Sequence, residues 1–189
     1  MLGGKTYAND RYSTLDQITA QNVTSLAPVA IVQTGMTASF ETTPVVVNGV
    51  MYVTTPVVDH KMKVMALNAA TAGRIWETTY NLGAFKICCG PVNRGVAVAY
   101  GKVYFVTLDA KLVALDAMTG KTVFQKSIAD PTGGFSETMA PTVYKHHVIV
   151  GSAGGEWAIR GFVASFDAST GKEAWRWQAT DPATFAGSS

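Results

Sequence analysis

Short apolar runs rich in β-branched residues recur along this chain, and tight-turn signals separate them. Three stretches have the pattern of a β-hairpin, residues 45–53, 96–106 and 142–150. The turn of the first stretch is Asn48-Gly49, the strongest short-range signal for a hairpin. His146-His147 lies at the tip of the third stretch, where we expect a turn and not a metal site. The pattern predicts three antiparallel strand pairs.

A second motif follows each hairpin and repeats three times. It reads as a strand, an Asp-x-x-Thr-Gly turn and another strand, and its Asp and Gly suit a tight turn. The motif occupies residues 64–76, 112–124 and 163–175, with Asn68, Asp116 and Asp167 opening its turns. An aromatic residue follows eight positions later in every copy, and we expect it to anchor the neighbouring unit. The first copy departs from the motif because Ala72 stands where the others have Gly.

A hairpin followed by this motif makes four antiparallel strands in about 50 residues, which is typical of a propeller blade. We therefore expect an all-β fold, a partial β-propeller of three blades plus a leading strand, in a single incomplete domain over residues 1–189. The expected parts are an N-terminal segment and strand at 1–35 and blades at 36–80, 81–130 and 131–189. The last range includes the start of the next blade. In the first part, 13–18 and 22–26 should form helical turns, the former capped by Ser13, and 29–32 a strand.

Composition excludes several functions. Hydrophobic residues make up 48% and charged residues 15% of the 189, with a formal net charge of +2. No basic run indicates a nucleic-acid or anionic-membrane surface. No apolar stretch reaches the roughly 18 residues of a membrane span, and the first residues lack the apolar core of a signal peptide.

Adjacent cysteines are the first candidate for special chemistry. The Cα atoms of Cys88 and Cys89 should be about 3.8 Å apart across a trans peptide, whereas ordinary disulfides span roughly 4.4–6.8 Å. A bond between them would close a small strained ring against which a planar ligand could lie. The alternative is a pair of reduced thiols in a buried turn. A bond would favour an oxidising compartment such as the periplasm.

Blade topology predicts that several polar residues share one rim. Glu41 and Thr138 both stand three residues before a proline, and Arg94 stands seven before Gly101. Each would lie where an innermost strand begins, on the same face as the loop 152–156 that follows a second strand. The alternative interpretation is structural: Glu41 and Arg94 could pair with each other, and Gly154-Gly155 could be a tight turn.

The segments that carry these residues resemble the quinoprotein alcohol dehydrogenases, which depend on pyrroloquinoline quinone (PQQ). The resemblance is most specific at Cys88-Cys89-x-x-Val92-Asn93-Arg94-Gly95 and at residues 151–156, followed by Arg160-Gly161. Residues 7–13 and 44–56 also look like that family. The resemblance implies an eight-bladed propeller with the quinone on its axis, so we expect this chain to be the N-terminal part of a longer enzyme.

The resemblance implies a role for each rim residue. Cys88 and Cys89 would form a vicinal disulfide covering one face of the quinone, and Arg94 would bond its reactive edge. Glu41 and Thr138 would bond other polar edges of the quinone. The loop Ala153-Gly154-Gly155 would bring backbone N–H groups to a quinone carboxylate, with Ala153 where relatives often carry a hydroxyl. Glu156 would ligate calcium, or a lanthanide in some members, as a hard ion with oxygen ligands.

The implied activity is oxidation of a small alcohol to an aldehyde in the periplasm, with electrons leaving to a cytochrome c. No catalytic residue can be assigned here, because the family's base aspartate should lie beyond Ser189. The same holds for its second metal ligand and the tryptophan on the other quinone face. Two alternatives remain: a non-catalytic propeller that acts as an envelope scaffold, and a sugar dehydrogenase, whose relatives generally lack adjacent cysteines.

Overall fold

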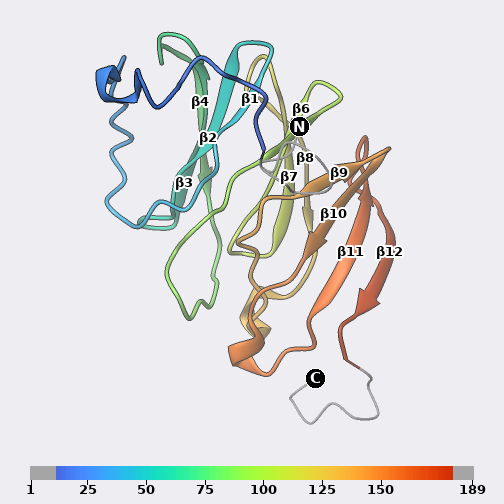
Figure 1. The fold of residues 1–189 in the computed structure, drawn as a ribbon. Coiled ribbons are helices and arrows are strands. Elements are labelled where there is room, and N and C mark those ends of the chain that lie inside the picture. The colour runs from blue at the N-terminus through green and yellow to red at the C-terminus, as the bar shows by residue number, and fades with distance from the viewer. Residues whose placement is uncertain (1–11, 181–189) are drawn as a thin grey trace.

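The computed structural model describes residues 12–180, which form three four-stranded antiparallel sheets lying side by side in chain order (Figure 1). The first sheet contains β1 (Val45–Val47), β2 (Val50–Thr54), β3 (Lys61–Asn68) and β4 (Arg74–Asn81). The second contains β5 (Ala97–Ala99), β6 (Lys102–Val106), β7 (Lys111–Asp116) and β8 (Thr122–Ser127). The third contains β9 (Thr142–Tyr144), β10 (His147–Gly151), β11 (Phe162–Asp167) and β12 (Glu173–Gln178). The predicted all-β fold of up-and-down blades is confirmed.

The first strands of the three sheets lie next to one another, as expected of innermost strands around a common axis. The segments that lead into them are joined by backbone hydrogen bonds. The Thr43 N–H donates to the Arg94 carbonyl at 3.2 Å, and the Arg94 N–H donates to the Thr138 carbonyl at 2.9 Å. This ladder carries residues from three blades to one end of the sheets.

The repeated turn forms as its sequence predicts. The Oδ1 of Asn68, Asp116 and Asp167 accepts hydrogen bonds from the backbone N–H groups two and three residues later. The position after Thr is left-handed in all three turns, with φ of 70° at Gly120 and 69° at Gly171. Ala72 adopts φ 59° in the first copy, so the missing glycine is tolerated without a change of turn.

Aromatic residues join each blade to the next. The Trp76 Nε1–H donates to the Ala117 carbonyl at 3.0 Å, and the Tyr104 hydroxyl donates to the Ala168 carbonyl at 2.7 Å. Burial raises the pKa of Tyr104 to about 12, which keeps the hydroxyl a donor. The rings of Trp76 and Phe124 lie against Gly120 and Gly171 of the following blade, where a Cβ would lie within 2.6 Å of ring atoms. The repeat's aromatic is therefore an inter-blade anchor in its first two copies.

The N-terminal part differs from its prediction. Residues 29–32 form no strand, and Val29 and Ile31 are 85% and 84% exposed. A strand needs a neighbour for its backbone hydrogen bonds, and this segment pairs with none of the described residues. Residues 13–18 form no helical turn, although the Ser13 Oγ accepts a hydrogen bond from the Leu15 N–H as an N-cap residue would. Within 22–26 the structure has a 3₁₀ turn, η1 (Val23–Ser25).

The remaining predictions concern the third hairpin turn, the chain ends and membrane spans. Lys145 and His146 form the third hairpin turn as predicted, the His146 ring stacks on Tyr100, and His147 begins β10. Two further 3₁₀ turns are η2 (Pro131–Gly133) and η3 (Gly155–Trp157). Residues 7–11, part of a segment used for the resemblance, and residues 181–189, at the end of the third predicted blade, lie outside the described residues. Over 12–180, no helix has the length and hydropathy of a membrane span.

Candidate functional site

A cavity of about 190 Å³ lies where the β4–β5 loop of the second blade meets the segments flanking β9 and β10 in the third. It contains seven of the nine residues singled out from the sequence, all except Glu41 and Gly155. The lining comprises Ile87, Cys88, Cys89, Gly90, Val92, Arg94, Ser136, Thr138, Ala153, Gly154, Glu156 and Trp157. Residues up to 70 positions apart thus converge on one rim, as the blade topology predicts.

Cys88 and Cys89 form a disulfide, with their Cα atoms 3.8 Å apart, so the alternative of two reduced thiols does not describe this structure. Both residues are exposed and form one wall of the cavity. Their loop is held at both ends. The Leu82 N–H donates to the His60 carbonyl at 2.8 Å, and the Val57 N–H donates to the Pro91 carbonyl at 2.8 Å. The first blade therefore fixes where the disulfide stands.

Arg94 links the three blades through its side chain as well as its backbone. Its Nη2 lies 2.9 Å from Glu41 Oε2, and its Nη1 donates to Thr138 Oγ1 at 2.5 Å. The side chains of Arg94 and Glu41 are 49% and 41% exposed, so their ion pair is screened and weak. Arg94 and Thr138 line the cavity, whereas Glu41 pairs with Arg94 and does not line it.

Asn93 directly precedes Arg94 in the chain and is buried, with hydrogen bonds from its side-chain amide. Its Oδ1 accepts from the Thr54 hydroxyl at 2.7 Å and from the Gly95 N–H at 2.9 Å. Its Nδ2 donates to the Val106 carbonyl at 2.9 Å. The side-chain amide therefore joins the first two blades directly beneath the rim. The sequence motif contains Asn93, but no role for it follows from the motif alone.

The loop after β10 approaches the neighbouring backbone closely. Gly154 has φ 119°, and a Cβ built on it would lie 2.1 Å from the Gly134 carbonyl oxygen. Only glycine fits both constraints. The Ala153 N–H already donates to the Ser136 carbonyl at 2.8 Å, so it is not available to a ligand. Gly155, by contrast, begins η3 with open space where its Cβ would be.

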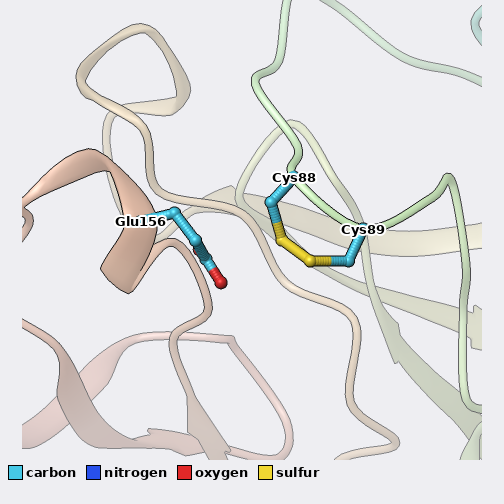
Figure 2. Close-up of side chains that lie close together, drawn as sticks. All are labelled: Cys88, Cys89 and Glu156. Carbon is cyan, nitrogen blue, oxygen red and sulfur yellow. A yellow bond between two sulfur atoms is a disulfide. The ribbon is translucent and has the colours of Figure 1, made fainter.

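Glu156 follows in η3 and reaches toward the disulfide across the cavity, as Figure 2 shows. A carboxylate oxygen of Glu156 and the sulfurs of Cys88 and Cys89 all lie within 4.8 Å of one another. Trp157 also lines the cavity, and the Lys86 ammonium lies 5.5 Å from the centre of its ring. The contact between Lys86 and Trp157 therefore joins the second and third blades at this rim, beside the disulfide and the Glu156 carboxylate.

Glu137 is a residue that the sequence did not single out. Its neighbours Ser136 and Thr138 line the cavity, whereas Glu137 is fully buried and neither carboxylate oxygen has a hydrogen-bond partner among the described residues. Phe135 and Met139 pack on the apolar core between the second and third blades, and alternation in an extended segment turns Glu137 to the same side. Side chains alternate in an extended segment, so the placement of Thr138 at the rim would also have identified Ser136 as a cavity residue. No local signal in the sequence predicts that Glu137 is buried.

Burial away from water raises the pKa of the Glu137 carboxyl well above its usual range, and the charge of Arg176 opposes this only in part. Since the unfolded chain releases this proton near pH 4.5 and the folded chain retains it, stability must fall as pH rises above that value. We expect a loss of about 1.4 kcal/mol in unfolding free energy per pH unit until the raised pKa is passed. Glu137→Gln should abolish this slope, as measured by chemical denaturation of the full-length protein at several pH values.

Glu173→Gln is the matched control, because Glu173 also faces Arg176. The hydrogen bond from Arg176 lowers the pKa of Glu173, so its stabilisation is present at neutral pH and is lost as pH falls through the lowered pKa. The two substitutions should therefore change stability in opposite directions with pH. Parallel curves for wild type and Glu137→Gln above pH 4.5 would contradict the burial of a protonated carboxyl.

The cavity fits one side of a planar, anionic cofactor with a hard cation. The disulfide offers an uncharged flat wall, Arg94 offers a guanidinium fork to oxygen atoms, and Glu156 offers an anionic oxygen ligand. The cavity is smaller than the roughly 300–1,000 Å³ typical of a pocket for a ligand of this size. The cavity by itself therefore does not enclose a ligand of that size.

Comparisons with known proteins point in the same direction. Residues 2–188 match the PQQ family, described as the glucose/ethanol/alcohol dehydrogenase beta-propeller domain. The chain is 42% identical over 185 residues to a quinohemoprotein alcohol dehydrogenase, ADH IIB, of Pseudomonas putida, covering 95% of this chain and 26% of that protein. It is 39% identical to a lanthanide-dependent methanol dehydrogenase of Methylacidiphilum fumariolicum (strain SolV), covering 93% of this chain and 29% of that protein.

Among solved structures, a europium-containing methanol dehydrogenase superposes with a TM-score of 0.88 at 36% identity. The superposition covers 97% of this chain and 32% of that one. The chain thus spans about a quarter to a third of the length of these relatives. The match over nearly all its residues, together with the three blades, shows that the chain belongs to the PQQ family of alcohol dehydrogenase β-propeller domains.

Proposed function

We propose that the whole protein oxidises small alcohols to aldehydes with PQQ and a hard metal ion, and that residues 12–180 form one side of the cofactor site. The observation that carries this proposal is the convergence of the Cys88–Cys89 disulfide, Arg94 and Glu156 on one cavity. The relatives' names support it, since they include alcohol and methanol dehydrogenases described as quinohemoproteins or as lanthanide-dependent.

Each residue has a task in this proposal. The Cys88–Cys89 disulfide forms a wall that excludes water from one face of the quinone, and Arg94, held by Glu41 and Thr138, donates hydrogen bonds at its oxygen-bearing edge. Gly154 lets the loop that carries Glu156 pack against the Gly134 carbonyl. Glu156 ligates the metal. When bound, PQQ supplies a two-electron acceptor and the ion a Lewis acid.

Of the ligands expected from the sequence, Glu41 takes a changed position in this proposal. Its carboxylate binds the Arg94 guanidinium and does not line the cavity, so it contributes by orienting Arg94. Ala153 and Gly155 contribute through loop shape, because the Ala153 N–H is bonded to Ser136 and Gly155 does not line the cavity. We further propose that a cytochrome c accepts the electrons and that the protein works in the periplasm, where a vicinal disulfide persists.

Reconstitution of the full-length protein tests this function. The protein should be prepared without quinone and metal, and alcohol-dependent reduction of an artificial electron acceptor should then be measured. We expect activity only when PQQ and calcium, or PQQ and a lanthanide, are both added. A nicotinamide cofactor in place of PQQ is the control. Activity that ignores PQQ, or binding of PQQ with no oxidation of any primary alcohol, would refute the proposal.

Cys88→Ser should weaken cofactor retention more than folding. The substitution removes the disulfide wall but leaves the loop's outer anchors at Leu82 and Pro91 intact. We expect the dissociation constant for PQQ to rise at least about tenfold, which corresponds to roughly 1.4 kcal/mol of lost contact, so that less PQQ is retained after gel filtration. The unfolding midpoint should change little. If PQQ retention and turnover equal those of wild type, the disulfide has no role in the site.

A further inference from the structure

The Cys88–Cys89 disulfide and Glu156 form a cluster whose chemistry depends on the redox state of the sulfurs. In the described part of the chain this is the one group of at least three His, Cys, Asp or Glu residues whose ligand atoms lie close enough to share a metal ion. All three residues are exposed, and Figure 2 shows the Glu156 carboxyl directed toward the paired sulfurs. An ion in the cavity could therefore reach all three without rearrangement of the blades.

Oxidised and reduced sulfurs favour different ions. In the disulfide the sulfurs carry no charge and are poor ligands, so Glu156 alone offers an anionic donor, and it is a hard oxygen ligand. Reduction would create two thiols, and the thiolates that they form on losing their protons are soft ligands that select zinc, cadmium and similar ions. Two thiolates and one carboxylate, with water in a fourth position, make an open tetrahedral site.

The geometry allows such a site to form. Donor atoms on a tetrahedral zinc ion are separated by about 3.5–3.8 Å, given metal–ligand distances of roughly 2.0–2.3 Å. The two sulfurs and the Glu156 oxygen already lie within 4.8 Å of one another. The loop's anchors, from Leu82 to His60 and from Val57 to Pro91, do not involve the disulfide. Opening the S–S bond therefore leaves both cysteines beside Glu156.

We propose that reduction of Cys88–Cys89 creates a binding site for a thiophilic divalent ion, held by both cysteine sulfurs and the Glu156 carboxylate. A phosphine reductant breaks the S–S bond, two electrons and two protons convert it to two thiols, and the phosphine leaves as its oxide with oxygen from water. The ion then displaces the two thiol protons. Since Glu156 is shared, a thiophilic ion would exclude a hard ion from the carboxylate. This last consequence rests on the proposed function, whereas the thiophilic site does not.

Cadmium binding to the full-length protein, without quinone, tests the proposal. The protein should be reduced with a phosphine, and the phosphine should then be removed under anaerobic conditions. Cadmium is added stepwise, and the charge-transfer band from sulfur to cadmium is followed in the near ultraviolet. We expect one ion to bind per reduced chain at this site and none per oxidised chain. A protein with Cys88→Ser and Cys89→Ser together identifies any signal from other cysteines and should lack the band. An identical band in this double variant would overturn the proposal.

Glu156→Gln tests the third ligand separately. The band should persist, because both sulfurs remain, but cadmium affinity should fall at least about tenfold. Glu77→Gln is the matched control, since Glu77 is paired with Lys63 on the first blade and should leave cadmium affinity unchanged. Unchanged affinity in Glu156→Gln would overturn the three-ligand site. None of these measurements requires turnover, so failure of the alcohol dehydrogenase proposal and failure of this one are distinguishable.

Discussion

Glu156→Gln is expected to abolish metal-dependent alcohol oxidation by the full-length protein. Glu156 is the one acidic residue that lines the cavity in the described part of the chain, and its carboxylate faces the open space beside the disulfide. An amide keeps the size of the side chain but loses its negative charge, and a neutral amide oxygen binds a hard cation more weakly than a carboxylate does. A metal acting as a Lewis acid supplies several kcal/mol, so kcat/KM should fall at least about 10³-fold.

Equilibrium calcium binding to the full-length protein separates loss of the ligand from loss of the fold. Glu156→Gln should bind calcium far more weakly than wild type. Its free energy of unfolding should stay within about 0.5 kcal/mol of wild type, the range of ordinary surface substitutions. Glu77→Gln, which removes a carboxylate paired with Lys63 and Arg74, should keep normal calcium affinity. Normal affinity in Glu156→Gln would show that other residues hold the metal.

The sequence predicts the blades well because their signals are local. Asn48-Gly49 and the Asp116 and Asp167 turns need only their own few residues, and each forms the expected hydrogen bonds or backbone angles. The order of the blades then determines which residues share a rim. The convergence of Arg94 and Thr138 could therefore be predicted from their distances to the hairpin tips, without any knowledge of side-chain contacts.

Where sequence reasoning fails or leaves a choice open, the answer depends on which residue a segment or side chain meets. A β-rich pattern at 29–32 cannot show whether a neighbouring strand exists, and none pairs with it among residues 12–180. For Glu41 the sequence left two alternatives, a ligand contact or a pair with Arg94, because Arg94 belongs to another blade, and the structure contains the pair. Glu137 is the strongest case, because a charged residue between two rim residues would be assigned to the surface, yet it is buried.

Gly154→Ala is expected to disrupt the cavity and destabilise the protein together. Alanine is strained at φ 119°, and its Cβ would lie 2.1 Å from the Gly134 carbonyl oxygen, which belongs to the backbone and cannot rotate away. A left-handed backbone costs a non-glycine residue about 1–2 kcal/mol, and overpacking costs about 1–3 kcal/mol more. We expect unfolding free energy to fall by about 2–5 kcal/mol and PQQ retention to be lost, as measured by chemical denaturation and gel filtration.

Gly155→Ala is the matched control for this prediction, because it adds the same methyl group one residue later. No atom lies within 4 Å of the Cβ position of Gly155, and its φ is outside the left-handed region. Its stability should therefore stay within about 0.5 kcal/mol of wild type, with PQQ retained. If Gly154→Ala and Gly155→Ala had the same stability and PQQ retention, the lack of a side chain at residue 154 would not be what PQQ binding requires. A large difference would show that the close approach of Gly154 to Gly134 is needed both for stability and for the loop that carries Glu156 to support PQQ binding.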